Sequence, residues 1–346
     1  MYPPQEEDSS ASNLKTGKRA LDDDELKDDL RHTKSRKLTD DDSLINDIIG
    51  RDISISCLIR CSRSDYASIA SLNRSFRSLV KSGAIYKLRR QNRIIEHWVY
   101  FSCQLLEWVA FDPVERRWMN LPTMRSGDTF MCTDKESLAV GTDLLVLGKD
   151  DGSSHVVYRY SLLTNSWSPG KKMNSPRCLF GSASLGEIAI FAGGCDSLGK
   201  ISDVAEMYNS ELQTWTTLPK MNKPRKPRSR EMPASAEAPP LVAVVNNELY
   251  AADHAGMVVR KYDKGSKKWF TLGRLPERAG SVNGWGLAFR ACGERLIVIG
   301  GPKSSGGGFI ELNSWIPTSG GSPPVWTLLD RKHSSNFVYN CAVMGC

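Results

Sequence analysis

The chain falls into three parts by its pattern of apolar and polar positions. Residues 1–43 are rich in charge, poor in aromatic side chains and lack apolar periodicity, which is typical of a disordered tail. Between 44 and 96 the apolar residues recur mostly every three or four positions, and this spacing predicts a small all-α domain. From 97 to 346 short apolar runs alternate with turn residues, which predicts a mainly β structure.

One helix of the α part has a clear pattern. Its apolar residues step by three or four positions from Tyr66 to Val80, and Gly83 stands where such a helix should end. A unit of only 40 to 50 residues buries too little apolar surface to be stable alone, so it is expected to dock against another part of the chain.

An aromatic residue stands seven positions before a tryptophan four times in the β part. The pairs are Phe111/Trp118, Tyr160/Trp167, Tyr208/Trp215 and Tyr262/Trp269. Turn residues lie inside each pair, so each pair predicts a β-hairpin with a large ring on both strands. Successive tryptophans are 49, 48 and 54 residues apart. Recurrence at this period predicts a repeat fold, in which each unit buries its rings against its neighbours.

The composition indicates what class of protein this is and in which compartment it is expected. The 346 residues are 40% hydrophobic and 25% charged, as in soluble proteins with a core. No run approaches the roughly 18 apolar residues that a membrane helix needs, so no membrane partner is expected. The polar, acidic N-terminus does not resemble a secretory signal. The nine cysteines are therefore expected to be free thiols in the nucleus, the cytoplasm or both.

The net charge of +7 is unevenly distributed. The tail holds eight basic and twelve acidic residues, about −4, which leaves about +11 on the rest of the chain. A basic folded body is a feature of nucleic-acid-binding proteins. The positive residues are scattered, however, and cluster only at 223–230, so an acidic protein partner explains the charge as well. Nucleic acid is therefore not the preferred partner.

No group of residues in the sequence suggests catalysis. The five histidines stand in different units or in the tail, without the paired spacing of metal ligands. Cys57 and Cys61 share a helical face but have no second cysteine pair, so a zinc site is not expected. Residues 301–305 resemble a fragment of a phosphate loop without the glycine that precedes its lysine. The sequence therefore predicts a non-enzymatic protein with no metal and no cofactor.

The repeated unit resembles the kelch repeat. Residues 177–219 carry a double glycine after an apolar strand, Gly193-Gly194, followed by Tyr208 and Trp215. The units at 130–171 and 239–274 depart from this pattern at the double glycine. The resemblance implies a β-propeller with one four-stranded blade per repeat over residues 97–346.

The helical part resembles an F-box domain. The segments 49–53, 57–60 and 71–79 follow the outline of that family, although Gly50 stands where the family has proline. With a kelch array downstream, the whole chain resembles plant F-box/kelch-repeat proteins of the Skp-interacting-partner type. The resemblance implies a substrate-recognition subunit of a cullin-RING (SCF-type) ubiquitin ligase. The F-box would bind the Skp-family adaptor, which joins the cullin, and the propeller would bind the target. The alternative is a kelch scaffold or regulator not coupled to a ligase.

The F-box resemblance implies an adaptor-binding surface. The candidate residues are apolar and lie on or under that surface: Ile53, Leu58, Ile59, Leu72, Phe76 and Leu79. Each of them either contacts the adaptor or belongs to the core of the helical domain.

Two kinds of residue are candidates for binding the target. Arg177, Arg225 and Arg278 occupy equivalent loops after successive tryptophans. They form either a basic ring for an acidic or phosphorylated segment, or attachments of each loop to a neighbouring blade. Trp285 and Trp315 lie outside the aromatic-to-Trp pattern, so they are spare rings that either bind the target or fill gaps between blades.

One unit is missing from the array. After residue 225 the pattern requires a strand, a double glycine and a hairpin, but residues 222–240 have the composition of a linker. About five blades remain when the incomplete unit at 98–121 is counted. We expect the final strand, within 336–346, to complete that first blade and to close the ring.

Overall fold

The computed structural model describes residues 50–104, 107–133, 135–150, 154–196, 198–219, 241–278, 284–301, 308–318, 321–334 and 337–346. The predicted tail 1–43, the linker-like residues 222–240 and Arg225 lie outside these ranges.

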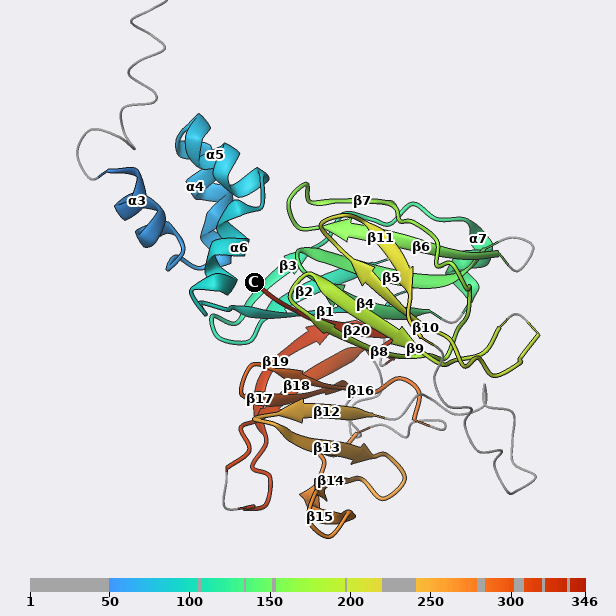
Figure 1. The fold of residues 1–346 in the computed structure, drawn as a ribbon. Coiled ribbons are helices and arrows are strands. Elements are labelled where there is room, and N and C mark those ends of the chain that lie inside the picture. The colour runs from blue at the N-terminus through green and yellow to red at the C-terminus, as the bar shows by residue number, and fades with distance from the viewer. Residues whose placement is uncertain are drawn as a thin grey trace, which may run out of the picture.

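The described chain begins with short helices that pack together beside the β structure (Figure 1). They are α3 (Arg51–Leu58), the 3-10 turn η1 (Arg63–Asp65), α4 (Tyr66–Leu72), α5 (Arg74–Lys81) and α6 (Ala84–Gln91). The single helix predicted from Tyr66 to Val80 is thus two helices. They separate at Asn73, which has an extended backbone and accepts a hydrogen bond from the Phe76 N–H (2.8 Å), so it caps α5.

Five four-stranded antiparallel sheets follow the helices and form the blades of a propeller (Figure 1). Blade 1 contains β1 (His97–Ser102), β2 (Trp108–Asp112), β3 (Arg117–Asn120) and β20 (Asn340–Gly345). The helix α7 (Asp128–Cys132) leads to blade 2, which contains β4 (Glu136–Val140), β5 (Asp143–Asp150), β6 (Ser154–Ser161) and β7 (Ser166–Pro169). The predicted mainly β propeller of five blades is confirmed.

The other three blades use consecutive strands. Blade 3 contains β8 (Gly181–Leu185), β9 (Ile188–Ala192), β10 (Ala205–Asn209) and β11 (Thr214–Thr217). Blade 4 contains β12 (Val242–Val245), β13 (Glu248–Asp253), β14 (Val258–Asp263) and β15 (Lys268–Arg274). Blade 5 contains β16 (Ala288–Cys292), β17 (Arg295–Gly300), β18 (Phe309–Trp315) and β19 (Thr327–His333).

Blade 1 is completed by the last strand, as predicted. Strand β20 pairs antiparallel with β1 in a register that sets His97 opposite Gly345 and Ser102 opposite Asn340. Residues from the two ends of the propeller therefore share one sheet, and blade 1 has apolar contacts on both of its faces.

Apolar clusters join most neighbouring blades. Separate buried clusters link blade 1 with blade 2, blade 1 with blade 5, blade 5 with blade 4, and blade 2 with blade 3. The tryptophan of a blade also donates its indole N–H to the blade before it, or to the segment leaving that blade. The pairs are Trp118 to Asp330 Oδ2 (2.7 Å), Trp167 to Pro122 O (2.8 Å), Trp215 to Lys171 O (2.8 Å) and Trp326 to Arg274 O (2.9 Å).

Blades 3 and 4 are different, because no buried cluster of the described residues joins them. Among the described residues the expected closure of the ring is therefore not seen at this junction: their apolar packing runs from blade 3 through blades 2, 1 and 5 to blade 4. The junction coincides with the place where the sequence pattern lacks one unit.

The helical domain docks on blades 1, 2 and 3. Its buried residues Ile59, Tyr66, Ile85 and Tyr86 belong to the same cluster as blade 1 and blade 2 residues. At the edge of this contact Arg90 forms an ion pair with Glu187 of blade 3. Gly83, whose φ of 77° favours glycine, sits so close to Leu163 that a Cβ would come within 3.0 Å of its Cδ1. The expectation that this unit docks against another part of the chain is thus met by the propeller.

Candidate protein-docking surfaces

A polar network fixes the helical domain to blade 1. The Glu96 carboxylate accepts hydrogen bonds from the Arg63 backbone N–H (2.9 Å), from Arg89 Nη2 (2.9 Å) and from the Trp98 indole N–H (2.8 Å). Arg63 donates in turn to the Tyr100 hydroxyl (2.7 Å) of β1. Both arginines are buried. A buried guanidinium is stable only when its charge and hydrogen-bond partners are in place. The network therefore fixes the helices in one position on the propeller.

The same network determines the charge of Glu96. Burial acts to raise the pKa of this carboxyl. The Arg63 N–H, the Trp98 indole and the two guanidinium charges act in the opposite direction, and together they hold the pKa below its usual value. Glu96 is therefore a carboxylate at neutral pH.

The six predicted adaptor-binding residues divide by exposure. Ile53 on α3 and Leu72 at the end of α4 are exposed, with 58% and 69% of their surface accessible. Phe76, Leu58 and Leu79 are half-buried, and Leu58 and Leu79 pack against the core. Ile59 is buried in that core, so it lies under the surface rather than on it.

The backbone at Gly50 differs from what proline allows. Its φ is 77°, whereas the proline ring holds φ near −65°. Gly50 precedes α3 without a side-chain cap, and a Cβ built there would meet nothing within 4 Å. The chain therefore enters the first described helix along a path that the proline of the F-box outline could not follow.

Two of the predicted target-binding arginines are buried inside the propeller. Arg177 pairs with Glu206 (2.7 Å) and donates to the carbonyl of Phe191, and both charged side chains are almost fully buried. Arg278 pairs with Glu311 (3.0 Å) and donates to the carbonyl of Gly300. Each arginine attaches its loop to the blade that follows, so this geometry favours the structural alternative for Arg177 and Arg278.

The predicted spare tryptophans have different surroundings. Trp285 is half-buried before β16. Trp315 is buried at the end of β18, where its ring contacts Tyr250 (5.9 Å between centroids) and Trp326 (5.9 Å). Trp315 therefore fills the boundary between blades 4 and 5, and one side of it also lines a pocket.

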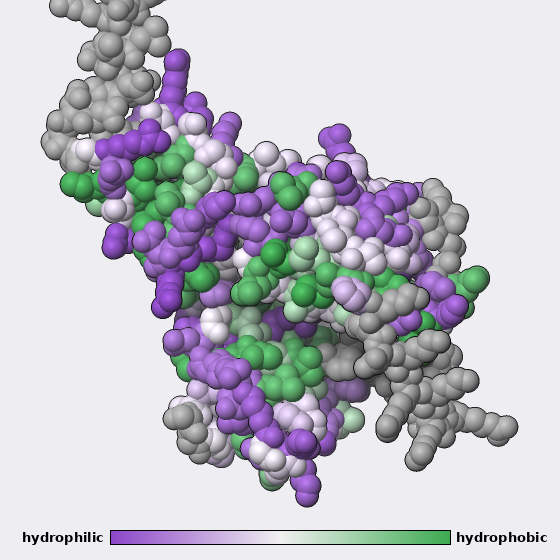
Figure 2. Space-filling view, in the orientation of Figure 1, coloured by the Kyte–Doolittle hydropathy of each residue, from purple (hydrophilic) through white to green (hydrophobic). Residues whose placement is uncertain are grey.

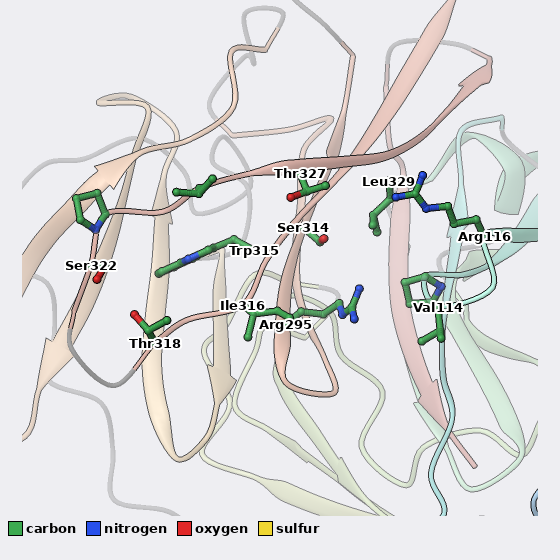
Figure 3. Close-up of a pocket in the computed structure, with 13 residues that line it drawn as sticks. Val114, Arg116, Arg295, Ser314, Trp315, Ile316, Thr318, Ser322, Thr327 and Leu329 are labelled. Carbon is green, nitrogen blue, oxygen red and sulfur yellow. The ribbon is translucent and has the colours of Figure 1, made fainter.

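That pocket has a volume of about 530 Å³ and lies beside Trp315 (Figure 3). Its lining comes from the β18–β19 connection, the β2–β3 turn and Arg295. Val114, Ile316 and Val325 give it exposed apolar walls, and Arg116 and Arg295 give it positive charge. Sequence reasoning missed all of these except Trp315, because the pocket joins turns from blades 5 and 1 that are distant in the chain.

Among the described residues no group of three or more His, Cys, Asp or Glu side chains could hold a metal ion. Within the same ranges no helix is long and apolar enough to span a membrane.

Comparison with known proteins agrees with this architecture. The kelch motif model matches residues 131–174 and 176–222, which contain blades 2 and 3. The F-box/kelch-repeat protein SKIP11 of Arabidopsis thaliana is 73% identical over 89% of this chain and 76% of its own length. The chain belongs to the F-box/kelch-repeat proteins. Another F-box/kelch-repeat protein of that plant is 54% identical over 99% of this chain and 96% of its own length.

This family membership also bears on the missing unit. The alignment with SKIP11 spans 358 positions, but 89% of the 346 residues here is about 308. About 50 aligned positions therefore have no residue from this chain, which is the length of one repeat. A shortfall of this size agrees with the loss of one kelch blade.

Proposed function

We propose that this F-box/kelch-repeat protein is the substrate-recognition subunit of a cullin-RING (SCF-type) ubiquitin ligase. In this role the helical domain binds a Skp-family adaptor and, through it, a cullin. The propeller binds a target protein for ubiquitination. We also propose that it acts in the nucleus, the cytoplasm or both.

The observation that carries the proposal is the exposed apolar surface of the helical domain. Ile53 and Leu72 are large, apolar and exposed, although the domain has a core and a propeller on which to bury such residues. Both residues lie in segments that follow the F-box outline, Ile53 on α3 and Leu72 at the end of α4, where the resemblance implies the adaptor-binding surface. Membership of a family named for its F-box supports a Skp-family adaptor as the partner.

The fixed position of the helical domain on the propeller supports the same role. A receptor accelerates ubiquitin transfer by holding the target lysine near the conjugating enzyme, so its contribution is effective concentration. This works best when adaptor and target are held at a fixed geometry. The shared core and the buried Arg63, Arg89 and Glu96 network join the two parts without a flexible linker.

The target would bind on the propeller. The pocket beside Trp315 combines apolar walls with Arg116 and Arg295, which suits a segment carrying acidic or phosphorylated residues next to an apolar one. It is our preferred contact for the target.

A second candidate function follows from Gly50. Its positive φ directs the chain into α3 along a path that the proline of the family outline could not follow, and a different entry into α3 would change the adaptor-binding surface. A kelch scaffold or regulator without a ligase would have this property.

Adaptor binding separates the two functions. The full chain should be used, since the helical domain shares its core with the propeller. We expect the chain to retain a purified Skp-family adaptor, and Ile53→Asp and Leu72→Asp to weaken retention at least tenfold. Leu212→Asp, on the β10–β11 turn and 68% exposed, is the matched control and should bind normally. If the folded wild-type chain does not bind the adaptor, the ligase function is rejected and the function as a kelch scaffold or regulator remains.

A further inference from the structure

One face of blade 3 is not covered by any described residue. Strand β9 alternates in burial: Ala189 and Phe191 are buried against blade 2, whereas Ile188 and Ile190 are 40% and 44% exposed. Leu185 of β8 lies opposite Ile188 in the sheet and is exposed as well. Cross-strand partners point to the same side of a sheet, so these aliphatic side chains share the face turned away from blade 2.

One face of blade 4 is uncovered in the same way. In β12, Ala243 and Val245 are buried against blade 5, whereas Val242 and Val244 are 43% and 57% exposed. In β17 of blade 5, by contrast, four consecutive residues from Leu296 to Ile299 are buried, because that blade has a neighbour on each side. Strand β17 has the same place in its blade as β9 has in blade 3, so the exposure of Ile188 and Ile190 is a property of this junction, not of kelch blades.

The fourth aromatic pair of the repeat lies on this uncovered face. Tyr262 and Trp269 stack on each other (5.3 Å between centroids), as the other pairs do. The corresponding Phe111, Tyr160 and Tyr208 are buried against a preceding blade, but Tyr262 is only half-buried and Trp269 is exposed. No described residue accepts a hydrogen bond from the Trp269 indole, whereas the four other tryptophans of the repeat have acceptors.

These two faces form an open slot, defined by Leu185, Ile188 and Ile190 of blade 3 and by Val242, Val244 and Trp269 of blade 4. Figure 2 shows apolar residues gathered on both sides of a hollow between the two halves of the propeller. Each side of the slot has the apolar surface with which a kelch blade meets its neighbour.

The shape of the slot restricts what can fill it. The alignment lacks about one blade's length, so the missing element is a single layer. A kelch blade is a single sheet, so an element that takes its place is one sheet or hairpin. A second copy of the chain does not fit this description, because its own free faces are backed by the rest of its propeller. An occupant with apolar side chains on both faces can contact both sides of the slot.

The charges beside the slot restrict the occupant further. Residues 258–274 of blade 4 hold six basic residues and one acidic residue, Asp263. Arg260 and Lys261 form ion pairs with Asp253 and Glu248. Lys267, two positions before Trp269, forms no ion pair with any residue in the described ranges. Lys268 lies opposite Asp263 in the sheet, so it points to the other face from Trp269. Unpaired positive charge at the edge of an apolar surface favours an acidic partner.

We propose that the open slot between blades 3 and 4 is a protein-binding site for a β-hairpin that is apolar on both faces and flanked by acidic residues. Binding by sheet packing uses the faces of blades 3 and 4, whereas Lys267 selects the charge of the hairpin. This site is additional to the pocket beside Trp315 and does not depend on adaptor binding.

Fluorescence anisotropy with the full chain tests the proposal. The probe is a fluorescein-labelled hairpin peptide with valine and threonine strands, an Asn-Gly turn and Glu-Glu at both ends. The comparison peptide has Lys-Lys ends. We expect the acidic peptide to bind at least tenfold more tightly, and Lys267→Glu to reverse this preference.

Variants of the slot locate the binding. Ile190→Asp and Val244→Asp should each weaken binding at least tenfold, whereas Leu212→Asp should not. Because all three positions are exposed, the variants should unfold at similar temperatures and still retain the adaptor, so failure here is distinct from failure of the proposed function. Equal binding of both peptides, or unchanged binding by Ile190→Asp and Val244→Asp, would overturn the proposal. So would a wild-type dimer in sedimentation that Ile190→Asp dissociates, since a second copy would then cover the slot.

Discussion

Replacing Glu96 by alanine is expected to weaken the attachment of the helical domain to the propeller. The substitution removes the acceptor of the Arg63 N–H, of Arg89 and of the Trp98 indole at once. Removing one partner of a buried ion pair costs about 3 to 5 kcal/mol, because the remaining charge stays buried without compensation. For Glu96→Ala we therefore expect a loss of about 3 to 5 kcal/mol in the free energy of unfolding.

The network also predicts how stability depends on pH. The folded pKa of Glu96 lies below its unfolded value, which is about 4.3 for glutamate. Its contribution is therefore present above about pH 4.3 and is lost as the pH falls through the lower folded pKa. The difference in stability between wild type and Glu96→Gln should shrink over that acidic range.

Urea unfolding monitored by helical circular dichroism measures this effect. Glu211→Gln is the control, because Glu211 pairs with Lys87 across the same junction but at the surface, where ion pairs contribute little. If Glu96→Ala unfolds at the same urea concentration as wild type, the network does not hold the helices. If Glu211→Gln has the larger effect, the surface contacts do so instead.

Three further predictions follow from buried groups in the propeller. Arg177→Ala should destabilise the chain by about 3 to 5 kcal/mol in urea unfolding, because it leaves Glu206 buried and unpaired; an unchanged midpoint would show that the pair is dispensable. Trp167→Phe should cost about 1 kcal/mol more than Trp269→Phe in the same assay, since only Trp167 donates to a described acceptor; equal costs would contradict the difference between the junctions. Burial raises the pKa of the Cys292 thiol to about 12, so at pH 8 Ellman's reagent should modify exposed Cys57 quickly and Cys292 only after unfolding. Rapid loss of Cys292 from the native chain would show that the boundary of blades 1 and 5 opens.

Much of the fold can be predicted from the aromatic pairs. A ring such as Tyr160 or Tyr208 is too large for one sheet to bury, so its recurrence indicates a neighbour at every repeat. The same reasoning locates the missing unit, because the pair Tyr262/Trp269 is present whereas the unit that should precede it is absent. The aromatic pairs do not show whether the facing sides of blades 3 and 4 meet. Whether they meet depends on the angles between the other neighbouring blades.

The candidate site was harder to predict. Arg177 and Arg278 look like surface charges, because a loop arginine gives no sign of its partner. Their partners Glu206 and Glu311 lie 29 and 33 positions later, each on the third strand of the next blade. This repeated spacing is the signal that could have identified two buried ion pairs. The split between Ile59, which is buried, and Ile53, which is exposed, depends on the docking of α3 and is not encoded in apolar spacing alone.

The pairing of β20 with β1 has a consequence for synthesis on the ribosome. Arg63 of the helical domain donates to the carbonyl of Met344, which lies 281 positions later, and β1 pairs with β20 along its whole length. At roughly 5 to 20 residues per second, translation delivers that strand about 15 to 60 s after Arg63. The helical domain leaves the ribosome first, but the blade 1 surface on which it packs is incomplete until β20 has been synthesised. A nascent or prematurely terminated chain would therefore expose the apolar side of the helices without fixing them, which makes it prone to aggregation and a candidate for chaperone binding.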